Sequence, residues 1–293
     1  MSLSWGERTY VMGILNVTPD SFSGDGLVGR VGNPLYKTAV AQALQFVAAG
    51  VDILDIGGQS TRPGSKPVSA EEEAARVVPI IKAVREAVDV LISVDTYHAS
   101  VAKAALAVGA DWVNDVWGLW YDPKMVEVVA EADCPVVIMH NRMLPKSMAE
   151  IVRLNGRSLG KVYNDSLADV VAGLQARIDL AVANGVAPEN IIIDPGIGFG
   201  TTRRQNLRLI NNLHYFKQLG YPILLGTSRK GFIGNYLGGL PADDRVEGTA
   251  ATVAIGIDRG ADIVRVHDVK EMVRVARMTD HICRDASPRR LYG

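Results

Sequence analysis

The sequence predicts a single-domain (β/α)8 barrel, the TIM barrel of the α/β class. Short apolar runs alternate with helical patterns from end to end, there are eight such runs, and 293 residues suit a barrel of about 250 residues with short extensions. Strict alternation indicates parallel strands with right-handed crossovers, and eight such units can close into a ring. An open doubly wound sheet is the alternative, which the absence of G-x-G-x-x-G after the first run disfavours.

Each expected strand is a short run rich in β-branched residues, as in strands buried on both faces. In chain order the runs are TYVMGILN (9–16), VDILDIGG (51–58), VLISVDT (90–96), DWVNDV (111–116), PVVIMH (135–140), NIIIDPG (190–196), PILLGTS (222–228) and ADIVRVHD (261–268).

Helical patterns lie between these runs. In the second, apolar residues recur at spacings of four, three and four, at Val77, Ile81, Val84 and Val88. Ser69 with Glu72 three places on predicts a capping box at its start, and Pro79 predicts a kink. Five glycines stand just before strands, where a helix end needs a residue that tolerates positive φ: Gly50, Gly109, Gly185, Gly220 and Gly260.

One domain is expected over residues 1–285, followed by a polar, basic and disordered tail at 286–293. The net charge of −1, with acids and bases interleaved, offers no basic face for nucleic acid and no cationic amphipathic helix for a membrane. The partners are therefore expected to be small molecules. The start MSLSWGERTY has no apolar signal core, and the two cysteines show no metal or disulfide spacing, which favours a soluble cytoplasmic protein.

Every expected strand ends in polar residues. They include Asn16, Asp55, Asp95, Asn114, His140, Asp194, Ser228, Arg265 and His267. In a barrel these ends converge on one mouth, where active sites lie. A single Asx residue beside a strand is usually a turn former or a helix cap, but eight polar ends together indicate a binding site.

The stretch IIIDPGIGFG, residues 191–200, is the most informative of these ends. A strand that is buried on both faces ends in Asp194, followed by three alternate glycines. The carboxylate is expected to accept hydrogen bonds from a ligand, and the glycines to let the backbone bend beneath a flat ring, with Phe199 as an apolar wall.

The remaining polar residues divide into two groups. Asp95, Asn114 and Asp194 are short acceptors suited to the N–H edge of a flat heterocycle, and Lys230 is a complementary donor. The second group offers oxygen ligands and cations suited to a phosphate and its magnesium ion: Asn16, Thr61, Arg62, Arg265 and His267.

Seven ordered motifs carry a resemblance to a known family. They are GILNVTPDSFS (13–23), DIGGQSTRPG (55–64), SVDT (93–96), VND (113–115), IDPGIGFG (193–200), GTSRKGFIG (226–234) and RVHDV (265–269). Together they resemble the dihydropteroate synthases, the sulfonamide targets of folate biosynthesis. That family joins 6-hydroxymethyl-7,8-dihydropterin pyrophosphate to p-aminobenzoate and releases pyrophosphate.

The resemblance implies a role for each matching residue. Pterin binding falls to Asp95, Asn114, Asp194, Lys230, Met139 and Phe199; pyrophosphate binding to Asn16, Arg62, Arg265 and His267; and p-aminobenzoate binding to Thr61, Arg62, Pro63, Phe199, Ser228 and Lys230. Asn16 is the implied Mg²⁺ ligand, and the implied catalytic residues are Asp95, Arg62, Lys230, Arg265 and His267. The resemblance also implies a homodimer and a dissociative reaction, with Asp95 facing the developing positive charge.

Two alternatives remain open at this stage. One is a methyltetrahydrofolate-dependent methyltransferase domain, which shares DPG and VND but is disfavoured by NVTPDSF, STRPG and SRK. The other is a non-catalytic member of the same barrel family, which Gly24-Asp25 and Gly231 favour because they depart from the usual loop sequences.

Other polar residues are expected to have structural roles or are left with two alternatives. Asp52, Asp111 and Asp262 precede or open strands, so they are expected at the opposite mouth in stability roles. Asp55 is expected to brace the Thr61–Arg62 loop. His140 either lines the pterin pocket or completes the core, and the long connection 141–165 is either a lid or a decoration.

Overall fold

Eight parallel strands form the centre of the molecule in a computed structural model, which describes residues 3–17, 34–59, 68–142 and 166–284. The strands are β1 (Tyr10–Asn16), β2 (Ile53–Gly57), β3 (Leu91–Asp95), β4 (Trp112–Asp115), β5 (Val136–Met139), β6 (Ile191–Asp194), β7 (Leu224–Leu225) and β8 (Ile263–Val266). Their order is β6-β5-β4-β3-β2-β1-β8-β7, and a bridge between Ile193 and Ile223 joins the two outer strands. The predicted single-domain (β/α)8 barrel is confirmed.

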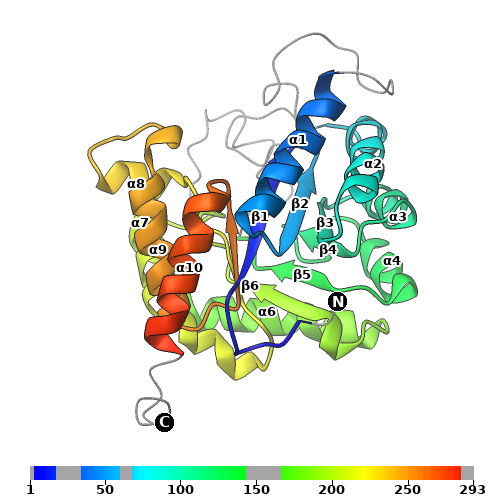
Figure 1. Cartoon of the computed structure of the whole chain (residues 1–293). Helices are drawn as coiled ribbons and strands as arrows, with labels where there is room; N and C mark the ends of the chain where they lie inside the picture. Colours follow the sequence, from blue (N-terminus) through cyan, green and yellow to red (C-terminus); the bar gives the residue numbers. More distant parts are fainter. Residues whose placement is uncertain (1–2, 18–33, 60–67, 143–165, 285–293) are drawn as a thin grey trace, which may run out of the picture.

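Helices surround the strands on the outside (Figure 1). They are α1 (Pro34–Ala49), α2 (Ala70–Ala87), α3 (Ala99–Ala107), α4 (Met125–Ala132), α6 (Ser166–Ala183), α7 (Arg203–Asn211), α8 (Gly231–Tyr236), α9 (Val246–Asp258) and α10 (Val269–Cys283), with 3-10 turns η2 (Pro188–Asn190), η3 (Leu213–Leu219) and η4 (Ala242–Asp244).

The local signals for helix boundaries largely hold. The Ser69 hydroxyl accepts the Glu72 N–H at 3.2 Å, and α2 continues through Pro79 to Ala87. All five glycines that were expected at positive φ adopt it, with values from 83° at Gly220 to 111° at Gly109. The proposed domain boundary at 285 stays a prediction, and the tail 286–293 lies outside the described residues.

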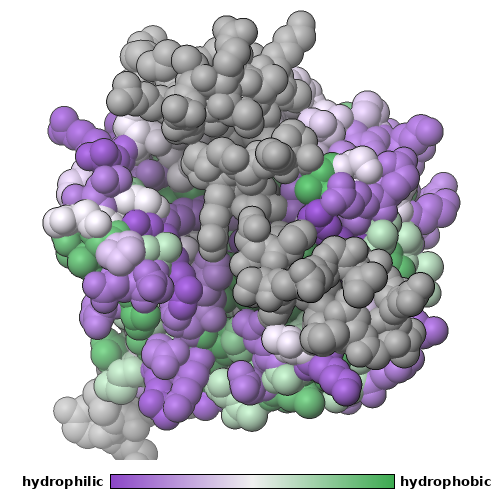
Figure 2. Space-filling model, turned by 90° about the horizontal axis from the view of Figure 1, so that it is seen from above, coloured by the Kyte–Doolittle hydropathy of each residue, from purple (hydrophilic) through white to green (hydrophobic). Residues whose placement is uncertain are grey.

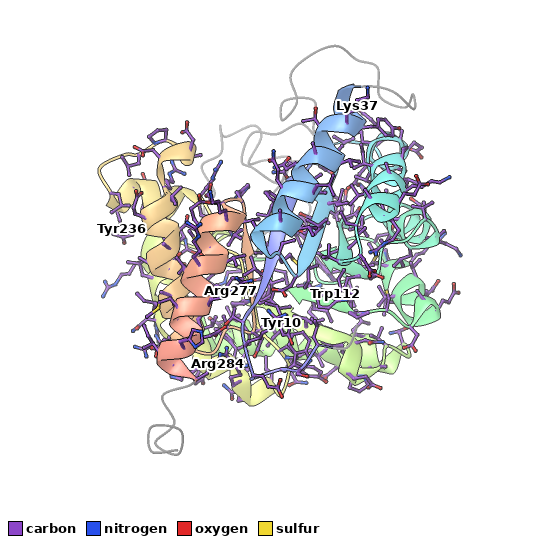
Figure 3. The ribbon with its side chains drawn as sticks, in the orientation of Figure 1. Tyr10, Lys37, Trp112, Tyr236, Arg277 and Arg284 are labelled. Atoms are coloured by element: carbon purple, nitrogen blue, oxygen red, sulfur yellow. The ribbon has the colours of Figure 1, made fainter. Side chains whose placement is uncertain are left out.

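The core has an inner and an outer layer. The outer layer lies between strands and helices, and the inner layer fills the barrel with side chains of Tyr10, Met12, Ile53, Trp112, Val137, Ile192, Leu224 and Ile263. Figure 3 labels two members of the inner layer, Tyr10 and Trp112. Because side chains alternate along a strand, residues two and four places after this layer also point inward, toward the carboxyl ends of the strands.

Seen from above, onto the carboxyl ends of the strands, the described rim is mainly hydrophilic with small hydrophobic areas (Figure 2). Among the described residues, no helix is long and apolar enough to cross a membrane.

Candidate active site

The predicted site residues share the inward phase of the strands. Asp55 lies two places after Ile53, Asn114 two after Trp112, Asp194 two after Ile192 and Arg265 two after Ile263. The same alternation places Asn16, Asp95, Met139, Ser228 and His267 on the inner face or its extension. The barrel interior therefore changes from an apolar layer to a polar one as it approaches its mouth.

Arg265 is the centre of the polar layer. Its Nε donates to Asp55 Oδ2 at 2.5 Å and its Nη2 to Asp95 Oδ2 at 2.5 Å. Asp55 Oδ2 also accepts from Asn114 Nδ2 at 3.1 Å. Asp55 is fully buried and organises two predicted ligand-binding side chains, whereas sequence reasoning assigned it to the Thr61–Arg62 loop.

Arg265 also joins the two predicted halves of the site. The sequence placed it with the phosphate-binding group, yet its described partners are carboxylates, one of them from the pterin-binding group. Its pKa is raised, because the charges of Asp55 and Asp95 outweigh the opposing effect of burial. Burial, with the charges of Asp55 and Asp115, raises the pKa of Asp95 to about 7 against the opposing effect of Arg265.

Asp194 ends β6 next to Lys230. Its Oδ1 accepts the Gly196 N–H at 2.7 Å, and burial raises its pKa while the Lys230 charge opposes that shift. Asp194 is not a helix cap, since the next helix, α7, begins at Arg203 with Thr202 as its N-cap. The alternative role of Asp194 as a helix N-cap is thereby excluded.

Lys230, which follows β7, reaches the loop after the neighbouring strand β6. Its Nζ donates to the Ile197 carbonyl and lies 4.8 Å from the centre of the Phe199 ring. Burial lowers its pKa to about 8, although the Asp194 charge favours the ammonium form. The ammonium group therefore lies beside the carboxylate that the sequence expected to read the ligand.

The glycines after Asp194 are explained by their neighbours. A Cβ on Gly196, which has φ +76°, would lie 1.8 Å from the His140 carbonyl oxygen, so no other residue fits there. A Cβ on Gly198 would lie 3.1 Å from Lys230 Cδ. These glycines thus let the end of β5 and the Lys230 side chain approach the loop. The sequence had instead suggested that the glycines make room for a flat ring.

An apolar cluster borders the polar layer. It consists of Tyr97, Val116, Trp117 and Met139, with Phe199 packed against them. Met139 and Phe199 were predicted, but Tyr97 and Trp117 were missed. Asp115 shapes this region, because its carboxylate accepts the N–H groups of Trp117 at 2.8 Å and Leu119 at 2.7 Å. The signal that could have found Trp117 is its position two places after the VND motif.

Glu73 is a second residue that sequence reasoning missed. It lies on α2, only 1% exposed, and burial raises its pKa to about 8, with Asp95 adding to the shift and Thr96 opposing it. Three places along the helix, Arg76 donates to the Gly58 carbonyl at 3.0 Å. Helix α2 thus contacts the ends of both β2 and β3 beneath the mouth.

Ser228 and His267 form a contact between the ends of β7 and β8. Ser228 Oγ accepts the backbone N–H of His267 at 3.1 Å and lies 3.0 Å from His267 Nδ1. The sequence assigned these residues to different substrates, so the structure brings together the regions expected to hold p-aminobenzoate and pyrophosphate.

Other predicted residues are placed less centrally or not at all. Asn16 ends β1 at the mouth, half-buried. Thr61, Arg62, Pro63 and the Gly24-Asp25 departure lie outside the described residues, as does the 141–165 connection beyond Arg142. Gly231 begins α8, and a Cβ there would meet open space.

His140 takes the core alternative that the sequence left open. A Cβ on Gly173 of α6 would lie 2.5 Å from its ring, so the imidazole packs against that helix. Burial, with the charges of Arg142 and Arg177, lowers its pKa to about 3. The ring is therefore neutral at physiological pH and turned toward α6.

A (β/α)8 barrel with buried carboxylates, two cations and an aromatic wall at its mouth defines an enzyme site for a small polar ring. Comparison with known proteins specifies the class. The model of the family described as "Pterin binding enzyme" matches residues 12–267. A dihydropteroate synthase of Bacillus subtilis strain 168 is 48% identical over 279 residues, covering 95% of this chain and 90% of the relative.

Solved structures agree. The dihydropteroate synthase of Clostridium difficile, determined in the presence of pteroic acid, has a TM-score of 0.86 and 45% identity, covering 97% of this chain and all of that one. The Xanthomonas albilineans enzyme with 4-aminobenzoic acid has a TM-score of 0.84 and 38% identity, covering 96% and 94% of the two chains. The chain belongs to the pterin binding enzymes and, among them, to the dihydropteroate synthase family.

Proposed function

We propose that the polar layer at the barrel mouth performs the dihydropteroate synthase reaction with the division of roles described below. In this reaction 6-hydroxymethyl-7,8-dihydropterin pyrophosphate and p-aminobenzoate give 7,8-dihydropteroate and pyrophosphate. The observation that carries the assignment is the network in which Arg265 joins Asp55 and Asp95 and Asn114 donates to Asp55, with Lys230 contacting the loop that follows the buried Asp194. The family relationship supports the same activity.

The pterin lies against Asp194, Asn114, Asp95 and Lys230 in this proposal. An ionised Asp194 accepts two parallel hydrogen bonds from the ring N–H and the exocyclic amine, and Lys230 donates to an acceptor atom of the ring. Met139, Phe199 and Trp117 supply apolar contacts from the cluster at the mouth. Burial strengthens each of these hydrogen bonds, because water competes for them less.

The pyrophosphate lies on the side of Arg265, His267 and Asn16, with Arg62 added from the β2 loop. Arg265 uses two nitrogen atoms for Asp55 and Asp95, and a guanidinium carries five N–H donors, so donors remain for phosphate oxygens. Because its pKa is raised, Arg265 stays charged throughout the reaction. In this proposal Asp55 and Asp95 fix the position of the guanidinium, which keeps its positive charge for the phosphate groups.

The chemical step breaks the C–O bond of the pterin methylene, and the bonding electrons leave with pyrophosphate. The positive charge spreads into the ring, and the amine lone pair of p-aminobenzoate forms the new C–N bond. The nitrogen then releases its proton to water. Asp95 faces the cation, while Arg265 and His267 stabilise the leaving group. Thr61, Pro63, Phe199 and Ser228 orient p-aminobenzoate.

We propose that a magnesium ion accompanies the pyrophosphate of the substrate. Among the described residues, no three His, Cys, Asp or Glu side chains are placed to hold a metal ion. Mg²⁺ bound to a pyrophosphorylated substrate takes most ligands from phosphate oxygens and water, and in this proposal the Asn16 side-chain oxygen at the mouth is its protein ligand. The ion would neutralise charge on the leaving group.

We propose further that the protein is a cytoplasmic homodimer. Exposed apolar side chains at the end of α8 and on α9, at Tyr236, Leu237 and Ile255, support self-association. Light scattering coupled to size exclusion tests this assembly, and a mass near 31.5 kDa would refute it.

The activity test supplies the dihydropterin pyrophosphate, p-aminobenzoate and Mg²⁺ and follows both products. Equal amounts of dihydropteroate and pyrophosphate are expected, with competition by sulfonamides at the p-aminobenzoate site. Tight pterin binding with no product would indicate a non-catalytic member of the family. Methyl transfer from methyltetrahydrofolate would indicate the methyltransferase alternative.

A further inference from the structure

Arg229 stands between two residues of the site and has an unusual backbone. Its φ is +57°, one of three non-glycine residues with positive φ among the described residues. This conformation is unfavourable for a residue with a Cβ and persists only where surrounding contacts impose it. Its neighbours Ser228 and Lys230 contact His267 and Ile197, respectively.

Contacts on every side hold Arg229 in this conformation. Its N–H donates to Thr249 Oγ1 at 3.1 Å, and its carbonyl accepts from Arg245 Nη1 at 2.8 Å. Its guanidinium donates to both carboxylate oxygens of Asp268, through Nε at 3.0 Å and through Nη2. A two-point contact of this kind fixes direction as well as distance.

Asp268 lies next to His267, just before α10. Ser228 and Arg229 therefore pair with His267 and Asp268 in two successive contacts, which bind the end of β7 to the end of β8. The Arg229 side chain is 30% exposed and that of Asp268 11%, so the pair is partly shielded from solvent.

We propose that the Arg229–Asp268 pair is a positioning device for the reaction: it holds the left-handed backbone at Arg229 that directs Ser228 toward His267 and Lys230 toward Asp194. Neither residue needs to touch a substrate. The inference rests on the proposed function for its kinetic consequence, but its structural consequence is independent of activity.

The test compares Arg229→Ala with Arg229→Gly. Both variants remove the ion pair, but glycine adopts positive φ without strain, whereas alanine favours a conformation that turns Ser228 and Lys230 away. We expect Arg229→Ala and Asp268→Ala to lower kcat/KM for p-aminobenzoate by about tenfold or more, and Arg229→Gly to recover several-fold of that loss. Equal rates for the alanine and glycine variants would overturn the proposal.

A matched control comes from the opposite end of the barrel. Arg85 pairs with Asp111 at 2.7 Å and has a side-chain exposure of 29%, close to that of Arg229. Arg85→Ala should lower the thermal midpoint and leave kcat/KM unchanged. If it reduces kcat/KM as much as Arg229→Ala does, general destabilisation explains the effect and the positioning role is wrong.

Hydrogen exchange followed by mass spectrometry separates this inference from the proposed function. The 226–236 segment should exchange faster in Arg229→Ala than in the unmodified protein, with partial recovery in Arg229→Gly and no change in Arg85→Ala. Unchanged exchange in Arg229→Ala would refute the device even in a fully active enzyme. If the unmodified protein forms no dihydropteroate, the proposed function fails while this exchange comparison still decides the inference.

Discussion

The two ends of the barrel use aspartate in opposite ways. At the amino ends of the strands, three aspartates each accept a backbone N–H from a neighbouring strand or from the residue just before it. Asp52 accepts from Val11, Asp111 from Ile92 and Asp262 from Ile223, all at 2.8 Å. Each also pairs with a cation: Arg8 at 2.6 Å, Arg85 at 2.7 Å and Lys217 at 2.5 Å. The hydrogen-bond donors and cations that these three carboxylates contact are all supplied by the protein itself.

At the carboxyl ends, among the described residues, Asp95 and Asp194 each have one hydrogen-bond donor, Arg265 and the Gly196 N–H respectively, whereas Asp55 and Asp115 each have two. The pKa values of Asp95, Asp115 and Asp194 are all raised, with burial as the largest cause. Arg265 opposes the shift of Asp95, and Lys230, the Gly196 N–H and Arg265 oppose the shift of Asp194. The difference agrees with the proposal above that one end serves stability, whereas the other receives a ligand that supplies hydrogen-bond donors.

The largest expected effect that would sharpen this comparison is at Asp194. Asp194→Asn should weaken pterin binding by roughly 3–5 kcal/mol, because an amide NH2 would face one of the two ligand donors. Calorimetric titration with a pterin measures this loss, and thermal unfolding should change little. Pterin affinity within a few-fold of the unmodified protein would remove the functional assignment of Asp194.

The corresponding change at the other end is Asp262→Ala. It removes the acceptor for Ile223 N–H and the partner of Lys217, so the free energy of unfolding should fall by about 2–3 kcal/mol. Urea unfolding measures the loss, and kcat/KM at a permissive temperature should stay unchanged. A large kinetic loss with intact stability would break the division between the two ends.

Lys230 gives an effect of intermediate size that depends on pH. Because its pKa is lowered to about 8, the ammonium donor is lost as pH rises above that value, and pterin affinity should fall by up to about tenfold per pH unit, or about 1.4 kcal/mol. The contribution of Lys230 to stability should change the other way. Between about pH 8 and the ordinary lysine pKa, Lys230 is protonated in the unfolded chain but largely neutral in the folded one. The free energy of unfolding that Lys230 contributes therefore increases with pH over this interval.

Titrations of pterin at several pH values, with unfolding curves at the same values, check both directions. Lys230→Arg stays charged and serves as the control, since its affinity should not fall over this range. Pterin binding by the unmodified protein that is constant from pH 7 to 9.5 would contradict the role of the ammonium group.

The smallest expected effect is at Arg8. Its side chain is 54% exposed and pairs with Asp52 at the amino end. Arg8→Ala should cost about 0.5 kcal/mol or less, because solvent screens exposed pairs, and sensitivity to salt should decrease. Unfolding at low and high salt measures it. A loss comparable to that of Asp262→Ala would show that exposure does not govern the strength of these pairs.

Much of this organisation was predictable because strand alternation is a strong constraint. Once Ile53, Trp112, Ile192 and Ile263 are placed inward, the inward direction of Asp55, Asn114, Asp194 and Arg265 follows from a period of two. The location of Asp52, Asp111 and Asp262 at the amino ends followed from their position before the strands, and their contacts confirm it, whereas their stability roles stay a prediction.

The partners within the site were not predictable in the same way. Arg265 matches a phosphate-binding pattern in sequence, but its contacts with Asp55 and Asp95 depend on the curvature that brings β8, β2 and β3 together. Tyr97 and Trp117 lie in loops two places after the ends of β3 and β4, where the alternation of the strand is only a weak guide to side-chain direction. The positive φ of Arg229 carries no local signal, because tertiary contacts impose it.

The closure between β6 and β7 has a consequence for how the chain could be reconnected. Strand β7 has two residues and meets β6 through one bridge, whereas the other neighbouring strands share continuous ladders. A circular permutant that opens the chain at Gly220, just before β7, and joins the ends of the described barrel through a linker would cut it at this seam. Its strands would run in the order β7, β8, β1 and onward to β6. The permuted chain would therefore begin with β7 and have β6 as its last strand, the two neighbouring strands that share the fewest backbone pairings.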